Sequence, residues 1–124
     1  MSEPLDPKSL ALKFTECINS KDVDGLGKLM THDHCFVDPE DEVDEGKRSC
    51  LENWQGFFQI FPDYQNITEN VNVEGDMVII EGRTECSDNR LTGPAIWTAK
   101  FEGDKIKEWR VYEDTPANRA KLIK

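Results

Sequence analysis

The segment His32–Glu42, with the sequence HDHCFVDPEDE, gathers the side chains of this chain that are best suited to chemistry. Two histidines and several carboxylates flank the short run CFV, which begins with a cysteine. Histidine and carboxylate side chains bind metal ions, and they also serve as general acids and bases. The segment therefore has three possible interpretations: a metal site, a catalytic base at the mouth of a pocket, or a solvated turn.

The spacing argues against a metal site. Residues two apart on a strand share a face, so the positions of His32 and His34 allow chelation in principle. However, His32 falls in the turn after a predicted helix, and no third ligand stands at a fixed spacing. The acidic residues that follow lack the glycine and the alternating ligands of a calcium loop, which favours a solvated loop. These acidic residues are Glu40, Asp41, Glu42, Asp44 and Glu45. We expect no metal and no other cofactor.

Asp38 is the candidate general base. It follows the apolar run CFV, on a strand expected to lead from the core to the mouth of a pocket. A carboxylate beside aromatic side chains is partly desolvated, which makes it a better proton acceptor. His34 shares strand parity with Asp38 and could assist it as a histidine–carboxylate pair. Two alternatives stay open: Asp38 as an Asp-Pro turn residue bonded to backbone amides, and His34 as a packed core histidine.

Length and charge narrow the range of folds and partners. The chain has 124 residues, a formal net charge of −10 and 37% hydrophobic residues. This length and apolar content predict one domain, residues 1–124, with a core of its own. Nucleic acids and anionic membranes bind through basic patches, so we expect neither as a partner.

The N-terminus and the cysteines predict a cytoplasmic protein. The stretch MSEPLDPKSL has no basic region followed by an apolar run, unlike a signal peptide. No apolar stretch is long enough to span a bilayer. The cysteines are scattered without a C-x-x-C pair, which predicts reduced, buried thiols. They are Cys17, Cys35, Cys50 and Cys86.

The first half of the sequence predicts three helices that would help to position the candidate base. The first has Asp6 as its N-cap, a proline directly after it, and apolar residues at helical spacing from Leu10 to Ile18. A shorter second helix starts near Asp22. A third helix runs from about Glu45 to Phe61, where Pro62 ends it.

The second half changes to the period of strands. The segments QNITENVNV, MVIIEGRTEC, PAIWTAKF and KIKEWRVYED are separated by turn signals and predict a meander of four long strands. Thr115 and Pro116 then start a short C-terminal helix that ends at Leu122. The predicted fold class is α+β, with three N-terminal helices packed on a curved antiparallel sheet to form a cone. A cone with incompletely filled walls contains a pocket.

This order of elements and motifs resembles the SnoaL-like group of the nuclear-transport-factor-2-like (NTF2-like) superfamily. The resemblance rests on LMTHDHCFVDP, FFQIFPDY and DKIKEWRVYED and covers roughly residues 8–122. It implies an NTF2-like cone. The superfamily includes isomerases, cyclases, epoxide hydrolases, dehydratases and non-catalytic binding modules, so the function must be argued from the site.

Two enzyme branches of the superfamily imply roles for single residues. In ketosteroid isomerases the general base is an aspartate before a proline, which corresponds to Asp38. The two oxyanion-hole donors of the isomerase correspond to Phe14 and Trp97, which cannot replace them, so authentic isomerase activity is not expected. In limonene-epoxide hydrolases an Arg-x-Asp helps to activate water. The segment Arg83–Glu85 resembles it, but Val111 stands where a second aspartate is needed.

The same resemblance predicts which residues of the second long strand face the cone. Alternate residues from Met77 to Glu85 would face inward, as would Trp97. Val78 and Ile80 would then lie on the outer face, which predicts a homodimer through that face. The alternative for Arg83 is that it bridges two carboxylates at an exposed rim.

Taken together, these patterns predict a small, mostly apolar pocket for a small hydrophobic carbonyl compound. The chain would be a cofactor-independent isomerase, cyclase or hydratase in which Asp38 transfers a proton, His34 assists and Arg83 polarises the oxygen. The predicted ligand-binding residues are Phe14, Trp54, Phe58, Glu81, Glu85, Trp97 and Glu113. The competing hypothesis is a non-catalytic binding module or dimeric scaffold, in which aromatic side chains would plug the cavity.

Overall fold

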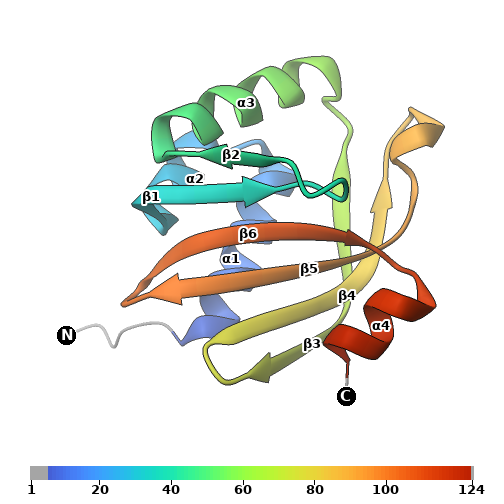
Figure 1. Cartoon of the computed structure of the whole chain (residues 1–124). Helices are drawn as coiled ribbons and strands as arrows, with labels where there is room; N and C mark the ends of the chain where they lie inside the picture. The colour runs from blue at the N-terminus through green and yellow to red at the C-terminus, as the bar shows by residue number, and fades with distance from the viewer. Residues whose placement is uncertain (1–5, 124) are drawn as a thin grey trace.

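Four α-helices and a six-stranded sheet make up residues 6–123, the part of the chain that the computed structural model describes (Figure 1). The helices are α1 (Pro7–Ser20), α2 (Val23–Leu29), α3 (Lys47–Ile60) and α4 (Pro116–Leu122). The strands are β1 (Met30–Val37), β2 (Val43–Glu45), β3 (Gln65–Glu74), β4 (Met77–Glu85), β5 (Gly93–Glu102) and β6 (Lys105–Glu113). Within these residues no helix is both long enough and apolar enough to cross a membrane.

The strand order in the sheet is β2-β1-β6-β5-β4-β3. β1 runs parallel to β6, and every other neighbouring pair is antiparallel. Figure 1 shows α1 and α2 behind the sheet, α3 along its upper edge and α4 on the opposite face. The predicted α+β class is confirmed. The prediction of three N-terminal helices is only roughly matched, because β1 and β2 lie between α2 and α3 in the chain.

The helix termini follow the local sequence signals. Asp6 accepts a hydrogen bond from the backbone N–H of Ser9 at 2.7 Å and so caps α1, which begins with a proline. Thr115 caps α4 in the same way, by accepting from the N–H of Asn118 at 3.1 Å. These caps satisfy donors that the first turn of a helix leaves without partners.

The register between β4 and β5 determines which residues face the helices. Ile80 lies directly opposite Trp97, and directly opposed residues share one face of a sheet. Trp97, Ile80 and Val78 are all buried in the main core. The predicted orientation of β4 is therefore wrong, because alternation allows two phases and only the pairing with β5 selects between them.

Consequently, the charged residues of β4 lie on the outer face of the sheet, opposite to the face on which α1 packs. The guanidinium of Arg83 forms salt bridges with Glu69 and Glu85, at 3.1 and 2.9 Å. This agrees with the alternative in which Arg83 bridges two carboxylates at an exposed rim. Glu81 binds Arg119 of α4 at 2.7 Å. Arg83, Glu81 and Glu85 are thus on the opposite side of the sheet from the pocket that they were predicted to line.

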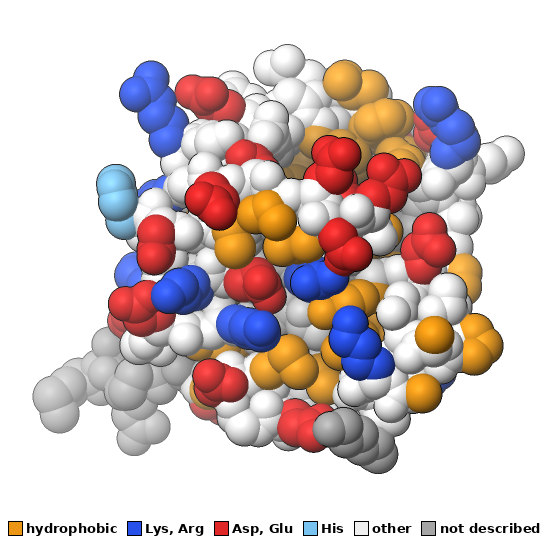
Figure 2. Space-filling view, viewed as in Figure 1, with side chains coloured by type: hydrophobic (Ala, Val, Ile, Leu, Met, Phe, Trp, Pro, Cys, Tyr) orange, Lys and Arg blue, Asp and Glu red, His pale blue; other side chains and the backbone are white. Residues whose placement is uncertain are grey.

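α4 covers an apolar part of this outer face. Leu122 packs against Ile79 and Ile96, which are almost fully buried within the single chain. Figure 2 shows acidic and basic side chains interleaved with hydrophobic ones over this face. The homodimer stays a prediction, but Val78 and Ile80, the two residues on which it was based, face the core.

A β-bulge in β3 changes which of its residues face inward. Asn66 pairs with Thr84, whereas beyond the bulge Val71 pairs with Ile80. Thr84 and Ile80 share the inner face of β4, so their partners Asn66 and Val71 both face inward. Without the bulge, residues separated by an odd number of positions would lie on opposite faces of the strand. Gly82 of β4 lies opposite the bulge, where there is no room for a side chain.

Candidate functional site

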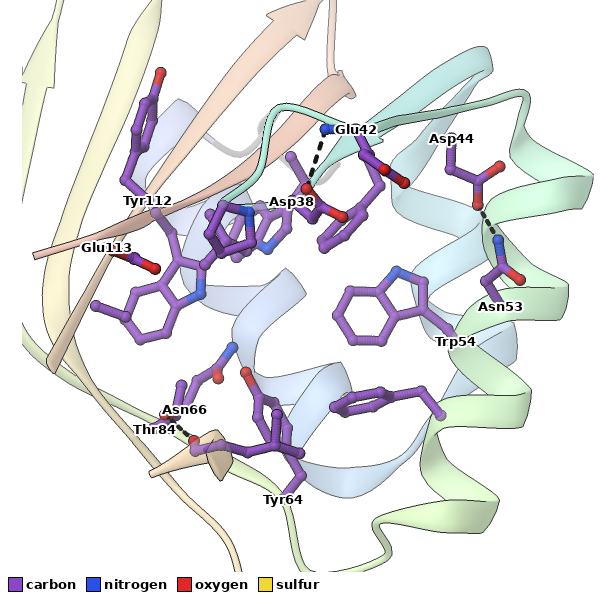
Figure 3. A pocket seen from close by; sticks show the side chains of 18 of the residues that line it. Asp38, Glu42, Asp44, Asn53, Trp54, Tyr64, Asn66, Thr84, Tyr112 and Glu113 are labelled. Carbon is purple, nitrogen blue, oxygen red and sulfur yellow. Dashed lines mark hydrogen bonds between the residues drawn. The ribbon is translucent and has the colours of Figure 1, made fainter. Parts of the chain in front are cut away.

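A cavity of about 620 Å³ opens between α3, the turn after β1 and the inner face of β4, β5 and β6. Figure 2 shows its mouth as a hollow below α3, with hydrophobic side chains inside and acidic ones at the edge, and Figure 3 shows the interior. Its aromatic lining residues are Phe36, Trp54, Phe57, Tyr64, Trp97, Trp109 and Tyr112. The volume lies within the range of small-molecule sites, about 300–1,000 Å³. The cavity is open and is not plugged by aromatic side chains.

Asp38 lies in the wall of this cavity, directly after β1 (Figure 3). Its Oδ1 accepts hydrogen bonds from the backbone N–H groups of Glu40 and Glu42, at 2.8 and 3.0 Å. Its Oδ2 has no hydrogen-bond partner among residues 6–123. One oxygen therefore holds the turn, as the Asp-Pro alternative requires, and the other makes no hydrogen bond within the described part of the chain.

His34 lies in the core and does not line the cavity. Its Nδ1 is 2.8 Å from the carbonyl oxygen of Ile106, and its ring centroid is 5.9 Å from that of Phe14. Nδ1 therefore carries the proton that this carbonyl accepts. Nε2 is buried without a hydrogen-bond partner in the described chain. The predicted pair with Asp38 is not formed, and the surroundings of His34 are those of a packed core histidine.

The buried position of His34 predicts a loss of stability in mild acid. Burial lowers the pKa of His34 below its ordinary value, although the bond to Ile106 and the nearby Asp33 and Asp44 act in the opposite direction. The unfolded chain, with a histidine pKa of about 6.5, therefore binds this proton more tightly than the folded chain. The contribution of His34 to the free energy of unfolding is complete above about pH 6.5 and falls below it, by at most about 1.4 kcal/mol per pH unit.

Urea unfolding at pH 7.5 and 5.5 measures this effect. In His34→Gln the decrease on acidification should be smaller than in the unmodified protein. His32→Gln is the matched control, because His32 is exposed and its replacement should leave the decrease unchanged. An equal decrease in His34→Gln and the unmodified protein would contradict the prediction.

The other predicted ligand-binding residues divide into two groups. Trp54, Trp97 and Glu113 line the cavity. Phe14 and Phe58 lie behind the lining: Phe14 is fully buried with its ring 4.4 Å from that of Trp109, and Phe58 stacks on Trp54 at 5.5 Å. Phe57, one position before Phe58, reaches the cavity instead.

Two polar residues of the cavity wall, Tyr64 and Asn66, were not among the predicted site residues. Their side chains are 8% and 3% exposed, whereas Gln65 between them is exposed. Burial raises the pKa of Tyr64, so its hydroxyl stays protonated at neutral pH and can donate a hydrogen bond. The Oδ1 atom of Asn66 is buried and has no partner in residues 6–123.

The C-terminal end of α1 holds these two residues in place. The side-chain amide of Asn19 donates to the carbonyl of Asn66 at 3.0 Å and accepts from its N–H at 2.8 Å. Lys21, in the left-handed conformation with φ 60°, donates from Nζ to the carbonyl of Tyr64. The backbone at both positions is therefore fixed by contacts that leave the two side chains free.

The rim of the cavity carries excess negative charge. The acidic lining residues are Asp38, Glu42, Asp44 and Glu113, and none of them forms an ion pair within the described chain. The single lining residue of positive charge, Arg90, is bound to Asp88 at 2.6 Å. This pairing lowers the pKa of Asp88 to about 2, so both partners are charged at neutral pH and their charges cancel.

Cys50 lies in the cavity wall as a protonated thiol. Burial and the nearby Asp44 raise the pKa of this thiol to about 12. A nucleophilic thiolate is therefore not expected at this position. Within residues 6–123 the four cysteines are unpaired, and no three or more His, Cys, Asp and Glu side chains come together as metal ligands.

Comparison with known proteins places the chain in a family. Residues 11–109 match the family described as SnoaL-like domain, and the chain belongs to this family. The match includes α3 and β1 to β5, which carry most of the cavity wall. No curated protein matches the chain.

Solved structures share the whole architecture, which is that of the NTF2-like fold. An NTF2-like protein of unknown function from Cytophaga hutchinsonii aligns with a TM-score of 0.77 at 18% identity, over 100% of both chains. A proposed SnoaL-like polyketide cyclase from Shewanella denitrificans has a TM-score of 0.75 at 20% identity, covering 94% of this chain and 98% of its own. An LEH-like epoxide hydrolase from M. tuberculosis has a TM-score of 0.75 at 14% identity, covering 86% and 81%. At these identities the likeness shows the fold alone.

Proposed function

We propose that the chain is a cofactor-independent enzyme that transfers a proton within a small hydrophobic carbonyl compound, with Asp38 as the general base. The observation that carries the proposal is the position of Asp38 in the wall of an aromatic cavity. Its Oδ1 is held by two backbone amides, and its Oδ2 has no hydrogen-bond partner among residues 6–123. A base must be fixed in orientation and still have a free lone pair, and this arrangement meets both conditions.

The proposed reaction begins at the carbon next to the carbonyl group. Asp38 Oδ2 takes a proton from this carbon, and the electrons of the C–H bond form a carbon–carbon double bond while the carbonyl oxygen becomes an enolate. The Tyr64 hydroxyl, which lies across the cavity from Asp38 in Figure 3, donates a hydrogen bond to this oxygen. A donor aimed at developing negative charge lowers the barrier of such a step. Asp38 then returns the proton to the same or a neighbouring carbon.

Exchange of the carbon-bound protons of 1-indanone in D2O, followed by proton NMR, tests this proposal. The protein should accelerate the exchange over buffer, and Asp38→Asn should reduce the acceleration by about 100-fold or more, as is typical for loss of a general base. Glu40→Gln is the matched control, because Glu40 is an exposed carboxylate of the same turn that does not line the cavity. Equal rates for Asp38→Asn and the unmodified protein would refute the role of Asp38.

A non-catalytic binding module of the same fold is the second candidate. The observation that favours it is the absence of the predicted assisting residues from the cavity: His34 lies in the core and Arg83 on the outer face. Binding of 1-indanone without any accelerated exchange would support this candidate over the enzyme.

A further inference from the structure

Four aromatic rings of the cavity wall meet nearly at right angles. The planes of Phe36 and Trp54 are inclined at 75°, those of Trp54 and Phe57 at 86°, and those of Phe57 and Tyr64 at 86°, with ring centroids 4.8–6.0 Å apart. All four residues line the cavity. Rings in this arrangement bend around a ligand instead of forming a flat stack, and the face of each ring carries partial negative charge. Aromatic cages bind organic ammonium groups for this reason.

The carboxylates of the lining keep their charge without a cationic partner. The side chains of Glu42 and Glu113 form no hydrogen bond or ion pair with a described residue. Asp44 accepts from the hydroxyl of Ser49 at 2.6 Å and from the side-chain amide of Asn53, and these neutral donors leave its charge in place. A cleft lined by charges of one sign attracts ligands of the opposite sign.

The positive side chains near the cavity do not cancel this charge. Arg90, the one basic lining residue in the described part of the chain, is held by Asp88 through two side-chain hydrogen bonds, at 3.0 and 2.6 Å. Arg110 and Lys121 lie outside the lining, and Arg110 is paired with Asp41. The charge balance of the cavity wall is therefore negative, and a cation from outside the chain would complement it.

Tyr64 adds a hydrogen-bond donor at the other end of the cavity. Its side chain is 8% exposed, and its hydroxyl forms no hydrogen bond to a residue within 6–123, although a buried tyrosine usually has such a partner. The hydroxyl is not one of the polar atoms that the surrounding protein seals off, so a ligand in the cavity can reach it. In Figure 3 it points into the cavity, whereas Asp38, Glu42 and Asp44 lie at the opposite end.

We infer that the cavity binds a hydrophobic ketone that carries an ammonium group on the carbon next to its carbonyl. Tyr64 donates to the ketone oxygen, the aromatic rings surround the ammonium group, and the carboxylates of Glu42 and Asp44 face it. The carbon between the two groups then meets Asp38. The inference rests on the proposed function, because Asp38 stays the base of the same site, and it extends that function by naming the substrate class.

Isothermal titration calorimetry with two ketones of the same shape tests the inference. Phenacyltrimethylammonium carries a trimethylammonium group where neopentyl phenyl ketone carries a tert-butyl group, so the two probes differ in charge alone. We expect the cation to bind about tenfold more tightly at about 20 mM salt, because the rings and the carboxylates both favour it. The preference should decrease at about 300 mM salt, since salt screens exposed carboxylates.

Variants without the charge assign the preference to the rim. Glu42→Gln should weaken binding of the cation about threefold, and Glu42→Gln combined with Glu113→Gln about tenfold, while the neutral ketone binds as before. Glu40→Gln is the matched control, because Glu40 is an exposed carboxylate of the same turn that does not line the cavity, and it should bind both probes like the unmodified protein. Tyr64→Phe should weaken both probes, since both ketones lose a hydrogen bond.

Failure of the inference differs from failure of the proposed function. If the two ketones bind equally, the inference is overturned while the cavity remains a binding site. The same conclusion follows if Glu40→Gln weakens the cation as much as Glu42→Gln, because the preference would then come from the net charge of the protein. If neither probe binds and 1-indanone exchange is not accelerated, both are overturned. If the preference for the cation depends on Glu42 but 1-indanone exchange is not accelerated, the recognition site stands and the proton-transfer function fails.

Discussion

Gly82→Ala is expected to lower the free energy of unfolding by about 3 kcal/mol or more, as a severe steric overlap in a packed sheet does. A Cβ atom at Gly82 would lie 1.9 Å from the carbonyl oxygen of Ile67, whereas real Cβ contacts stay beyond 3.0 Å. The obstacle is backbone and cannot rotate away, so β3 must separate from β4 or lose its bulge. The midpoint of urea unfolding measures the loss.

The same substitution should also disturb the candidate site. Without the bulge, strict alternation would place Asn66 and Val71 on opposite faces of β3. Gly56→Ala is the matched control, because a Cβ atom at Gly56 meets nothing within 4 Å and lies inside α3. That variant should gain about 0.5–1 kcal/mol from better helix propensity. A Gly82→Ala protein as stable as the unmodified one would refute the steric argument.

Phe14→Ala should cost about 3–5 kcal/mol of the free energy of unfolding, the range for removal of a buried phenyl ring. Phe14 is 0% exposed, and its ring lies 4.4 Å from Trp109, 5.9 Å from His34 and 6.5 Å from Trp54. It therefore joins α1 to β1, β6 and α3, and no neighbour can move far enough to fill the space. Chemical denaturation with circular dichroism detection gives the value.

Phe14→Ala also tests the predicted role of Phe14 in ligand binding. If Phe14 is a core residue, the variant should lose stability, and its folded fraction should bind 1-indanone with nearly unchanged affinity. Ile60→Ala is the control for loss of an apolar side chain, because Ile60 is 70% exposed and its truncation should change stability by less than about 0.5 kcal/mol. If Phe14→Ala reduced the free energy of ligand binding by more than it reduced the free energy of unfolding, Phe14 would belong to the cavity wall.

The fold was predictable from the sequence wherever a local signal decides the structure. Asp6 and Thr115 cap the first turns of α1 and α4, and Pro62 lies two residues after Ile60, the last residue of α3. The phase of β4 was not predictable in this way. Its residues alternate equally well in both phases, and only the pairing of Ile80 with Trp97 decides that the apolar residues face the core.

The candidate site was predictable in part, and Trp54 and Glu113 are among the predicted residues that line the cavity. Asp38 and Trp97 lie in the cavity wall, but Asn66 was missed because the alternation of β3 changes at the bulge. The isolated Gly82 inside a strand was the signal that could have indicated the bulge. His34 was placed on the right strand, yet no sequence pattern shows that the carbonyl of Ile106 binds its ring in the core.

The parallel pairing of β1 with β6 has a consequence for how the chain folds as it is synthesised. β6 is the last strand in the sequence, but it lies between β1 and β5 in the sheet. While the ribosome is still making β3 to β5, the helices α1 to α3 and the β1–β2 hairpin have no central strand to pack on. Contacts this distant in sequence form slowly. We therefore expect the sheet to close only once β6 has left the exit tunnel, and the apolar faces that pack on β6 to stay uncovered until then.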